Sequence, residues 1–275
     1  MLKRILLGLG GTEYTLPAIG HAVDIALRHQ ATITGITIVD TRQPGQTRVA
    51  SAAAHQGDAV HAEDPIATEQ HHVARSIEDF ERACSSAGVD YQVLPEHRNV
   101  LDVLIETSRY HDLTVFGLKS LFEYETPGDP ENAVLRLIAG GVRPILAVAR
   151  EYRDIRRVLI AYSGSMESAK AMKRFVQLRL WPDVRLRIVT FNASEPDAAK
   201  LARDAAEYCR AHGYAVDWQT DPGSAKLLLL AAAQLGQDDL IVMGSSARNV
   251  LLRRMFGDTA QSMIHDSDRP LFLCQ

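Results

Sequence analysis

The sequence repeats itself, and this repeat limits the possible folds more than any other feature of the chain. Three segments of the first half recur in the same order in the second half, at offsets of 153, 127 and 126 residues. The paired segments are Arg4–Thr12 with Arg157–Ser165, Asp112–Gly117 with Asp239–Gly244, and Arg143–Val148 with Arg269–Cys274. A tandem repeat of this size indicates two copies of one domain. We predict a first domain at residues 1–150 and a second at residues 151–275, joined by a short polar linker.

The first copy contains an insertion. The repeat offset falls by 26 residues between the first and second matches, so about that many additional residues lie between them. We place the insertion at about residues 40–68, which are rich in Ala, Gln, Gly, Asp and His and have no sustained apolar period, as is typical of a loop, which leaves a short helix or disorder within it open. The histidines in and beside it (His55, His61, His71 and His72) fit no common zinc spacing, so we expect them on a solvated surface.

Short apolar runs alternate with helical patterns in both copies. The runs are Ile5–Leu9, Ile33–Val39, Leu113–Phe116, Ile145–Val148, Val158–Ala161, Leu186–Val189, Leu240–Met243 and Leu271–Leu273. They are typical of strands buried on both faces of a parallel sheet. Helical spacing predicts helices around Ala18–Ala26 and Ala169–Val176, and further helices at Ala199–Arg210 and Ala225–Leu235, with Gly213 and Gly236 as their C′ glycines. The sequence therefore predicts an α/β fold with two tandem doubly wound, five-stranded parallel-sheet domains of the Rossmann-like type.

Composition excludes several classes of protein. A formal net charge of -4 and a pI near 6.2 argue against a nucleic-acid binder, which normally presents a basic face. The three cysteines, Cys84, Cys209 and Cys274, have no metal-ligand spacing and indicate a reducing compartment. The chain shows neither a signal peptide nor an apolar run of the ~18 residues that span a membrane. We therefore expect a cytoplasmic protein that binds neither membrane nor nucleic acid.

The loop from Met243 to Ala260 is the main candidate for ligand binding, because ligands on doubly wound sheets lie beyond the carboxyl ends of the strands. Gly244 and Gly257 let backbone N–H groups approach an anion, and the start of the following helix adds a favourable dipole. Asp258 begins that helix. It either caps the helix or places a negative charge against a phosphate, and the sequence leaves both interpretations open.

This loop resembles that of ATP-binding universal stress proteins, which carry Gly, two residues, Gly, nine residues, Gly and then Ser or Thr. Gly244, Ala247, Gly257 and Asp258 reproduce the spacing, with Ala and Asp replacing two of the residue types. The family's nucleotide-binding members end the first strand with Asp-Gly-Ser, whereas here Gly10–Thr12 and Ser163–Ser165 lack the Asp. The resemblance implies an adenine nucleotide alpha hydrolase-like fold and a site for ATP or AMP in the second copy. Its expected residues are Ser163, Gly164, Ser165, Val189, Met243, Gly244, Ser245, Ser246, Ala247, Arg248, Gly257, Asp258 and Thr259.

The first copy departs further from the family pattern. Only seven residues separate Ser120 from Gly128, and the loop is acidic, so we expect this copy to be structural or to face a partner. Single-domain members of the family form dimers through their last strand. The resemblance therefore implies that the apolar segments Arg143–Val148 and Arg269–Cys274 join the two copies as an intramolecular pseudo-dimer, and it leaves a further homodimer open.

Two hypotheses about function follow. The chain is a stress-response protein that senses ATP or AMP through its second copy, or a universal stress protein that binds no nucleotide and acts as an interaction scaffold for an unidentified protein. The segment Ser163–Ser168 also resembles the phosphate loop of ATP pyrophosphatases, which gives a third hypothesis of an AMP-forming enzyme. The sequence has no evident general base or metal-holding carboxylate pair, so we expect no catalysis beyond weak ATP hydrolysis.

Overall fold

The computed structural model describes residues 2–37, 65–94, 100–118, 142, 144–191, 197–245 and 258–274. The first half contains β1 (Arg4–Leu9), α1 (Thr15–His29), β2 (Thr32–Thr37), α2 (Pro65–Ala87), β3 (Tyr91–Leu94), α3 (Val100–Ser108), β4 (Leu113–Gly117) and β5 (Ile145–Val148). The second half contains β6 (Arg157–Ala161), α6 (Met166–Leu178), β7 (Arg185–Phe191), α7 (Asp197–Ala211), β8 (Ala215–Asp221), α8 (Ala225–Leu235), β9 (Leu240–Gly244), α9 (Asp258–Asp266) and β10 (Leu271–Cys274).

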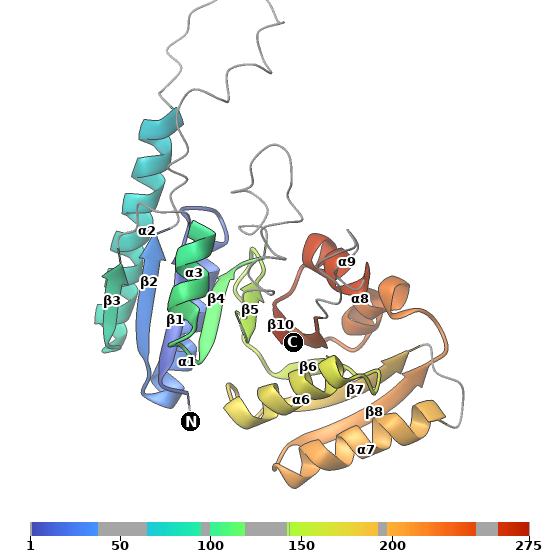
Figure 1. The fold of residues 1–275 in the computed structure, drawn as a ribbon. Helices are drawn as coiled ribbons and strands as arrows, with labels where there is room; N and C mark the ends of the chain where they lie inside the picture. Colours follow the sequence, from blue (N-terminus) through green and yellow to red (C-terminus); the bar gives the residue numbers. More distant parts are fainter. Residues whose placement is uncertain are drawn as a thin grey trace, which may run out of the picture.

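All ten strands belong to one sheet, in the order β3-β2-β1-β4-β5-β10-β9-β6-β7-β8 (Figure 1). Neighbouring strands are parallel within each half, whereas β5 and β10 pair in antiparallel register, with Phe272 opposite Leu146. Read from either edge inward, each half has the same strand order. The predicted α/β fold is confirmed, and so is the pairing of the two last strands. The domain boundaries at residues 150 and 151 stay a prediction.

Burial explains which strands lie at the centre of the sheet. Every residue of β4, β5 and β10 is buried, and β1 exposes only Arg4. The edge strand β8 instead buries Val216 alone among its seven residues. Strands covered on both faces need apolar side chains at every position, and strands at an edge do not.

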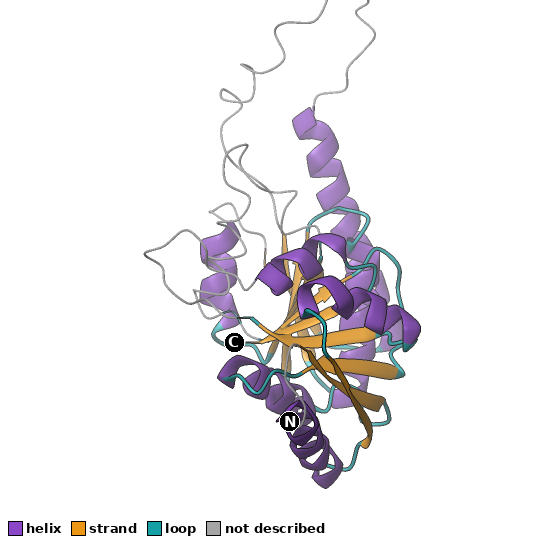
Figure 2. Ribbon diagram, turned by 90° about the vertical axis from the view of Figure 1, so that its right-hand side faces the viewer, coloured by secondary structure: helices purple, strands orange, loops and turns teal. Residues whose placement is uncertain are grey.

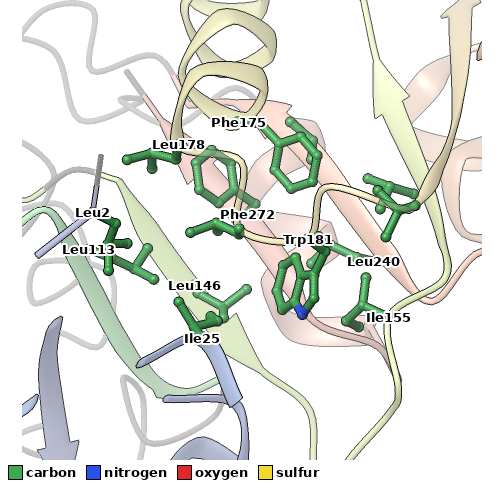
Figure 3. Packing of buried hydrophobic residues seen from close by; sticks show 14 of the residues in the cluster. Leu2, Ile25, Leu113, Leu146, Ile155, Phe175, Leu178, Trp181, Leu240 and Phe272 are labelled. Carbon is green, nitrogen blue, oxygen red and sulfur yellow. The ribbon is translucent and has the colours of Figure 1, made fainter. Parts of the chain in front are cut away.

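Helices cover both faces of the sheet (Figure 2). One apolar cluster contains side chains from α1, α2, α6 and α7, and the other contains side chains from α3, α8 and α9. Both clusters run from the first half into the second. Figure 3 shows the first of them, in which Ile25 of α1, Leu146 of β5 and Phe272 of β10 lie in one cluster with Phe175 of α6. The rings of Phe175 and Phe272 meet edge to face with their centroids 5.4 Å apart. The two halves therefore share continuous cores.

One local prediction stays untested, and another needs correction. Helix α2 begins at Pro65, so the predicted end of the insertion, about residue 68, lies in its first turn; residues 38–64 lie outside the described part of the chain, and the bounds of the insertion stay a prediction. Gly213 has the predicted left-handed conformation, with φ 88°. Gly236 does not, because its φ is -77° and the left-handed residue is Gln237.

The presence of a glycine at position 236 has a different explanation. A side chain there would overlap Asp238 and the guanidinium of Arg187, which form a buried ion pair next to it. Arg187 also donates from Nη2 to the carbonyl oxygen of Ala232, at 2.7 Å. Close approach of side chains, rather than the conformation of a helix end, leaves no room for a Cβ at this position unless the Arg187–Asp238 pair moves.

Candidate functional site

A cavity of about 300 Å³ lies at the carboxyl ends of β6 and β9. From β6 the chain moves outward through β7 to β8, and it then returns to the other side of β6 to form β9 and β10. The cavity is therefore at the topological switch point of the second half, where ligands of doubly wound sheets bind. Its described lining is Ala161, Tyr162, Ser163, Ser165, Ser168, Phe191, Ala225, Met243, Gly244, Thr259 and Ala260.

Three serines form a polar cluster in this lining, at the start of α6. The N-cap is Ser165, in the extended conformation, and its Oγ accepts a hydrogen bond from the backbone N–H of Ser168 at 3.2 Å. The hydroxyl oxygen of Ser163 lies 3.1 Å from that of Ser165 and 3.3 Å from that of Ser168. Hydroxyl groups both donate and accept, and the start of α6 carries the positive end of its dipole. This part of the cavity suits a polar or anionic group.

Apolar side chains form much of the remaining lining. Phe191 and Met243 are buried, at the ends of β7 and β9, and Ala225 and Ala260 lie at the starts of α8 and α9. Tyr162 is half-buried, and burial, assisted by the charge of Asp204, raises the pKa of its phenol. The phenol is therefore neutral at pH 7. An apolar surface beside a group of hydroxyls is suited to a flat ring that carries a polar substituent.

Gly244 has a packing role that the motif did not predict. A Cβ at this position would lie 2.6 Å from the carbonyl carbon of Glu167 and 2.7 Å from the backbone nitrogen of Ser168. The absence of a side chain lets the first turn of α6 pack against the end of β9. Gly164 has φ 75°, a left-handed conformation that favours glycine in the turn before α6.

Five of the residues predicted from the sequence lie together in the cavity lining: Ser163, Ser165, Met243, Gly244 and Thr259. Val189 does not, since it is buried within β7 and its carbonyl oxygen accepts a hydrogen bond from the backbone N–H of Tyr162 at 2.9 Å. Ser245 is also buried, and its N–H donates to the carbonyl oxygen of Cys274 at 2.9 Å. Neither of them is part of the described lining.

The remaining predictions concern the loop before α9. Helix α9 begins at Asp258, so this residue takes the first helical position rather than the capping position before it. A carboxylate in the first turn still interacts favourably with the helix dipole. The side chain of Asp258 lies outside the described part of the chain, as do Ser246, Ala247, Arg248 and Gly257.

Six residues of the lining were not among the predicted site residues: Ala161, Tyr162, Ser168, Phe191, Ala225 and Ala260. Ser168 was detectable, because it follows the capping Ser165 by three residues and so lies on the same face of α6. Phe191 and Ala225 belong to no motif. They reach the cavity because parallel strands end at the same edge of the sheet.

The corresponding turn of the first half is covered by protein. Gly11 has φ 69°, and a Cβ there would lie 2.9 Å from the Cβ of His72 on α2. His71 and His72 are exposed, as predicted; His55, His61 and the acidic loop between Ser120 and Gly128 lie outside the described residues. No group of three or more potential metal ligands occurs among the residues that the structure describes. Within the same residues, no helix has both the length and the hydropathy to cross a membrane.

Comparison with known proteins identifies a group with this fold. The model of the universal stress protein family matches residues 1–118 and 192–275, which together form more than half of the chain. The Synechocystis universal stress protein Slr1230 is 20% identical and covers 98% of this chain and 99% of its own length. A universal stress protein from Archaeoglobus fulgidus has a solved structure with a TM-score of 0.70 and 16% identity, covering 99% of this chain and 96% of that one. A Pseudomonas aeruginosa protein of unknown function, PA1789, has a TM-score of 0.64 and 15% identity, covering 99% and 92%.

Proposed function

Because the chain belongs to the universal stress protein family, we propose that its second half senses an adenine nucleotide, ATP or AMP, in the cavity at the ends of β6 and β9. The observation that carries this proposal is the position of three helix starts around one cavity. Ser165 caps α6, Ala225 begins α8 and Thr259 is the second residue of α9, and all three line the cavity. Helix N-termini present free N–H groups and a positive dipole, which together favour phosphate.

The remaining lining supports a purine as the other part of the ligand. Phe191 and Met243 offer apolar surface, and Ser163 and Tyr162 supply hydroxyl groups for the edge of a base. A volume of about 300 Å³ is at the lower end of the range for small-molecule sites. This volume favours a mononucleotide whose phosphates lie at the mouth of the cavity, near α9.

Sensing, rather than catalysis, is the activity that this lining supports. Within its described part, the cavity is lined by no Asp, Glu, His, Lys or Arg side chain. Phosphoryl transfer needs a base or positioning group and a metal held by carboxylates. We therefore propose that the signal is whether a nucleotide is bound at the site, rather than the formation of a reaction product there.

One observation favours the alternative of an interaction scaffold. Helix α8 is rich in leucine, and Leu227 and Leu235 are 76% and 87% exposed, with the exposed Ala231 between them at helical spacing. Large apolar side chains on one exposed face are typical of a contact surface for another protein. In this alternative the family fold is kept and the ligand is a protein partner.

Two substitutions on one helix separate the hypotheses. Ala225→Phe adds a ring at the rim of the cavity, and Ala231→Phe adds the same ring on the exposed face of α8, as a matched control. After acid extraction of any bound nucleotide, calorimetric titration with ATP and AMP should show one site per chain in the parent and in Ala231→Phe, and none in Ala225→Phe. Failure of the parent protein to bind either nucleotide at millimolar concentration would exclude nucleotide sensing.

A further substitution tests the charge at the first position of α9. Asp258→Ser replaces a carboxylate by the residue type found in ATP-binding members of the family. It should strengthen ATP binding, because the negative charge that opposes the phosphates is removed. Equal affinity of Asp258→Ser and the parent protein would show that residue 258 lies away from the phosphates.

A further inference from the structure

A histidine without hydrogen-bond partners lies where the two halves meet. His21 of α1 is 1% exposed, and neither of its ring nitrogens has a hydrogen-bond partner. Its ring packs at 4.6 Å, centroid to centroid, on Tyr152 of the linker between the halves, and at 6.3 Å, edge to face, on Trp181. Trp181 belongs to the second half, in the turn between α6 and β7. His21 is therefore enclosed by three segments, one from each half and one from the linker.

The contacts around His21 hold the same three segments together. Trp181 donates from Nε1 to Oδ2 of Asp24 on α1, at 3.0 Å, and Arg28 donates from Nε to the other oxygen of Asp24, at 2.9 Å. A Cβ on Gly20 would lie 3.0 Å from Cδ2 of Tyr152, so α1 approaches the linker closely. These contacts, which we call the junction, join the two halves through α1 and the Trp181 turn. They are separate from the pairing of β5 with β10.

The surroundings of His21 oppose a positive charge. Burial lowers the pKa of His21 to about 4, and the nearby charge of Asp24 raises it by less. Both carboxylate oxygens of Asp24 already accept hydrogen bonds, from Trp181 and Arg28. The other ionisable group at the ring is the phenol of Tyr152, whose pKa is raised by burial and then by Asp24 and Asp154. Among the described residues, α2 and the strands packed on α1 add no charge that shifts the pKa of His21.

We propose that His21 is an acid-sensitive lock between the two halves: the neutral ring keeps α1 packed on Tyr152 and Trp181, and protonation releases this contact. A protonated imidazole has two N–H donors, and neither would find an acceptor in the closed junction. The charged ring can be hydrated only if α1 separates from the Trp181 turn. Release is therefore driven by the proton itself, and the released state exposes Trp181, which is 3% exposed in the closed junction.

The direction and size of the effect follow from the two pKa values. The open state binds a proton with the ordinary pKa of histidine, 6.5, and the closed state with a pKa of about 4. The open state binds more protons between these values, so the closed junction is fully favoured above pH 6.5 and weakens as the pH falls toward 4. The ratio of open to closed molecules should rise on the order of a hundred-fold across this window.

Hydrogen–deuterium exchange between pH 7 and pH 4, corrected for the chemical exchange rate, measures this ratio segment by segment. In the parent protein, the protection of α1 and of the Trp181 turn should fall by roughly a hundred-fold, while β9 and β10 keep theirs. In His21→Phe the ring is retained but no longer titrates, so the fall should disappear. His21→Gln serves as a second, smaller replacement that does not titrate, and His212→Phe, at an exposed histidine, serves as the control.

Three outcomes overturn the proposal. The first is a fall in protection that persists in both His21 variants, and the second is a parent protein whose junction keeps its protection down to pH 4. The third is an equal fall in all segments, which would mean global unfolding rather than release of the junction. Partial burial lowers the pKa of His111 as well, so its protonation also opposes the folded state as the pH falls. The comparison that decides is therefore parent against variant at each pH.

Discussion

Substitution of Gly244 by Ala tests whether this residue serves packing or a ligand. The added Cβ would lie 2.6–2.8 Å from three backbone atoms of Glu167 and Ser168 in the first turn of α6. No side-chain rotation relieves contacts with backbone atoms, so α6 or the end of β9 must move. The φ of Gly244 is outside the left-handed region, so the conformation of an alanine there adds no strain of its own.

Overpacking of this kind costs about 1–3 kcal/mol. The expected result for Gly244→Ala is a loss of stability of that size without any nucleotide present, seen as a urea midpoint lowered by roughly 0.5–1 M in far-UV circular dichroism. Because the first turn of α6 carries Ser165 and Ser168, nucleotide affinity should fall as well. An unchanged midpoint with weakened nucleotide binding would refute the packing argument and return Gly244 to a role at the phosphates alone.

Three further substitutions probe separate parts of the fold by the same urea titration. Ser165→Ala removes the cap of α6 and should cost about 0.5–2 kcal/mol, whereas Ser165→Asp, which restores an acceptor, should recover most of it. Asp238→Ala leaves the buried guanidinium of Arg187 without its carboxylate and should cost about 3–5 kcal/mol; a loss below about 1 kcal/mol would show that water reaches Arg187. Phe272→Ala removes the edge-to-face contact with Phe175, next to the pairing of β5 with β10. It should lower the free energy of unfolding by about 3–5 kcal/mol, with both halves unfolding together.

The central strands were predictable from the sequence, and the edge strands were not. Strands such as β4 and β5 are buried on both faces, so their sequences are continuous apolar runs. The edge strand β8 has the sequence AVDWQTD and buries only Val216, so it carries no comparable signal. Five strands were expected in each half, but the sequence assigned residues to only four of them, and β3 and β8 are the strands that had no predicted segment.

The candidate site was predictable at the turns after β6 and β9, and only there. Ser163, Ser165 and Gly244 follow strands whose ends the repeat had marked, and the structure brings them together. Phe191 and Ala225 are ordinary apolar residues at the ends of other elements, and only the packing of the sheet brings them to the cavity. His21 is similar, because a histidine on an amphipathic helix gives no sign of the linker and turn that enclose it.

The antiparallel pairing of β5 with β10 has a consequence for how the two halves can diverge. In a dimer of identical chains, each interface residue occurs twice, so one mutation alters both subunits at once. A covalent tandem removes this constraint while the tether keeps the pairing formed at any protein concentration. One half can therefore close its own ligand turn beneath a helix, as His72 does over Gly11, and still supply the strand that completes the sheet of the other half.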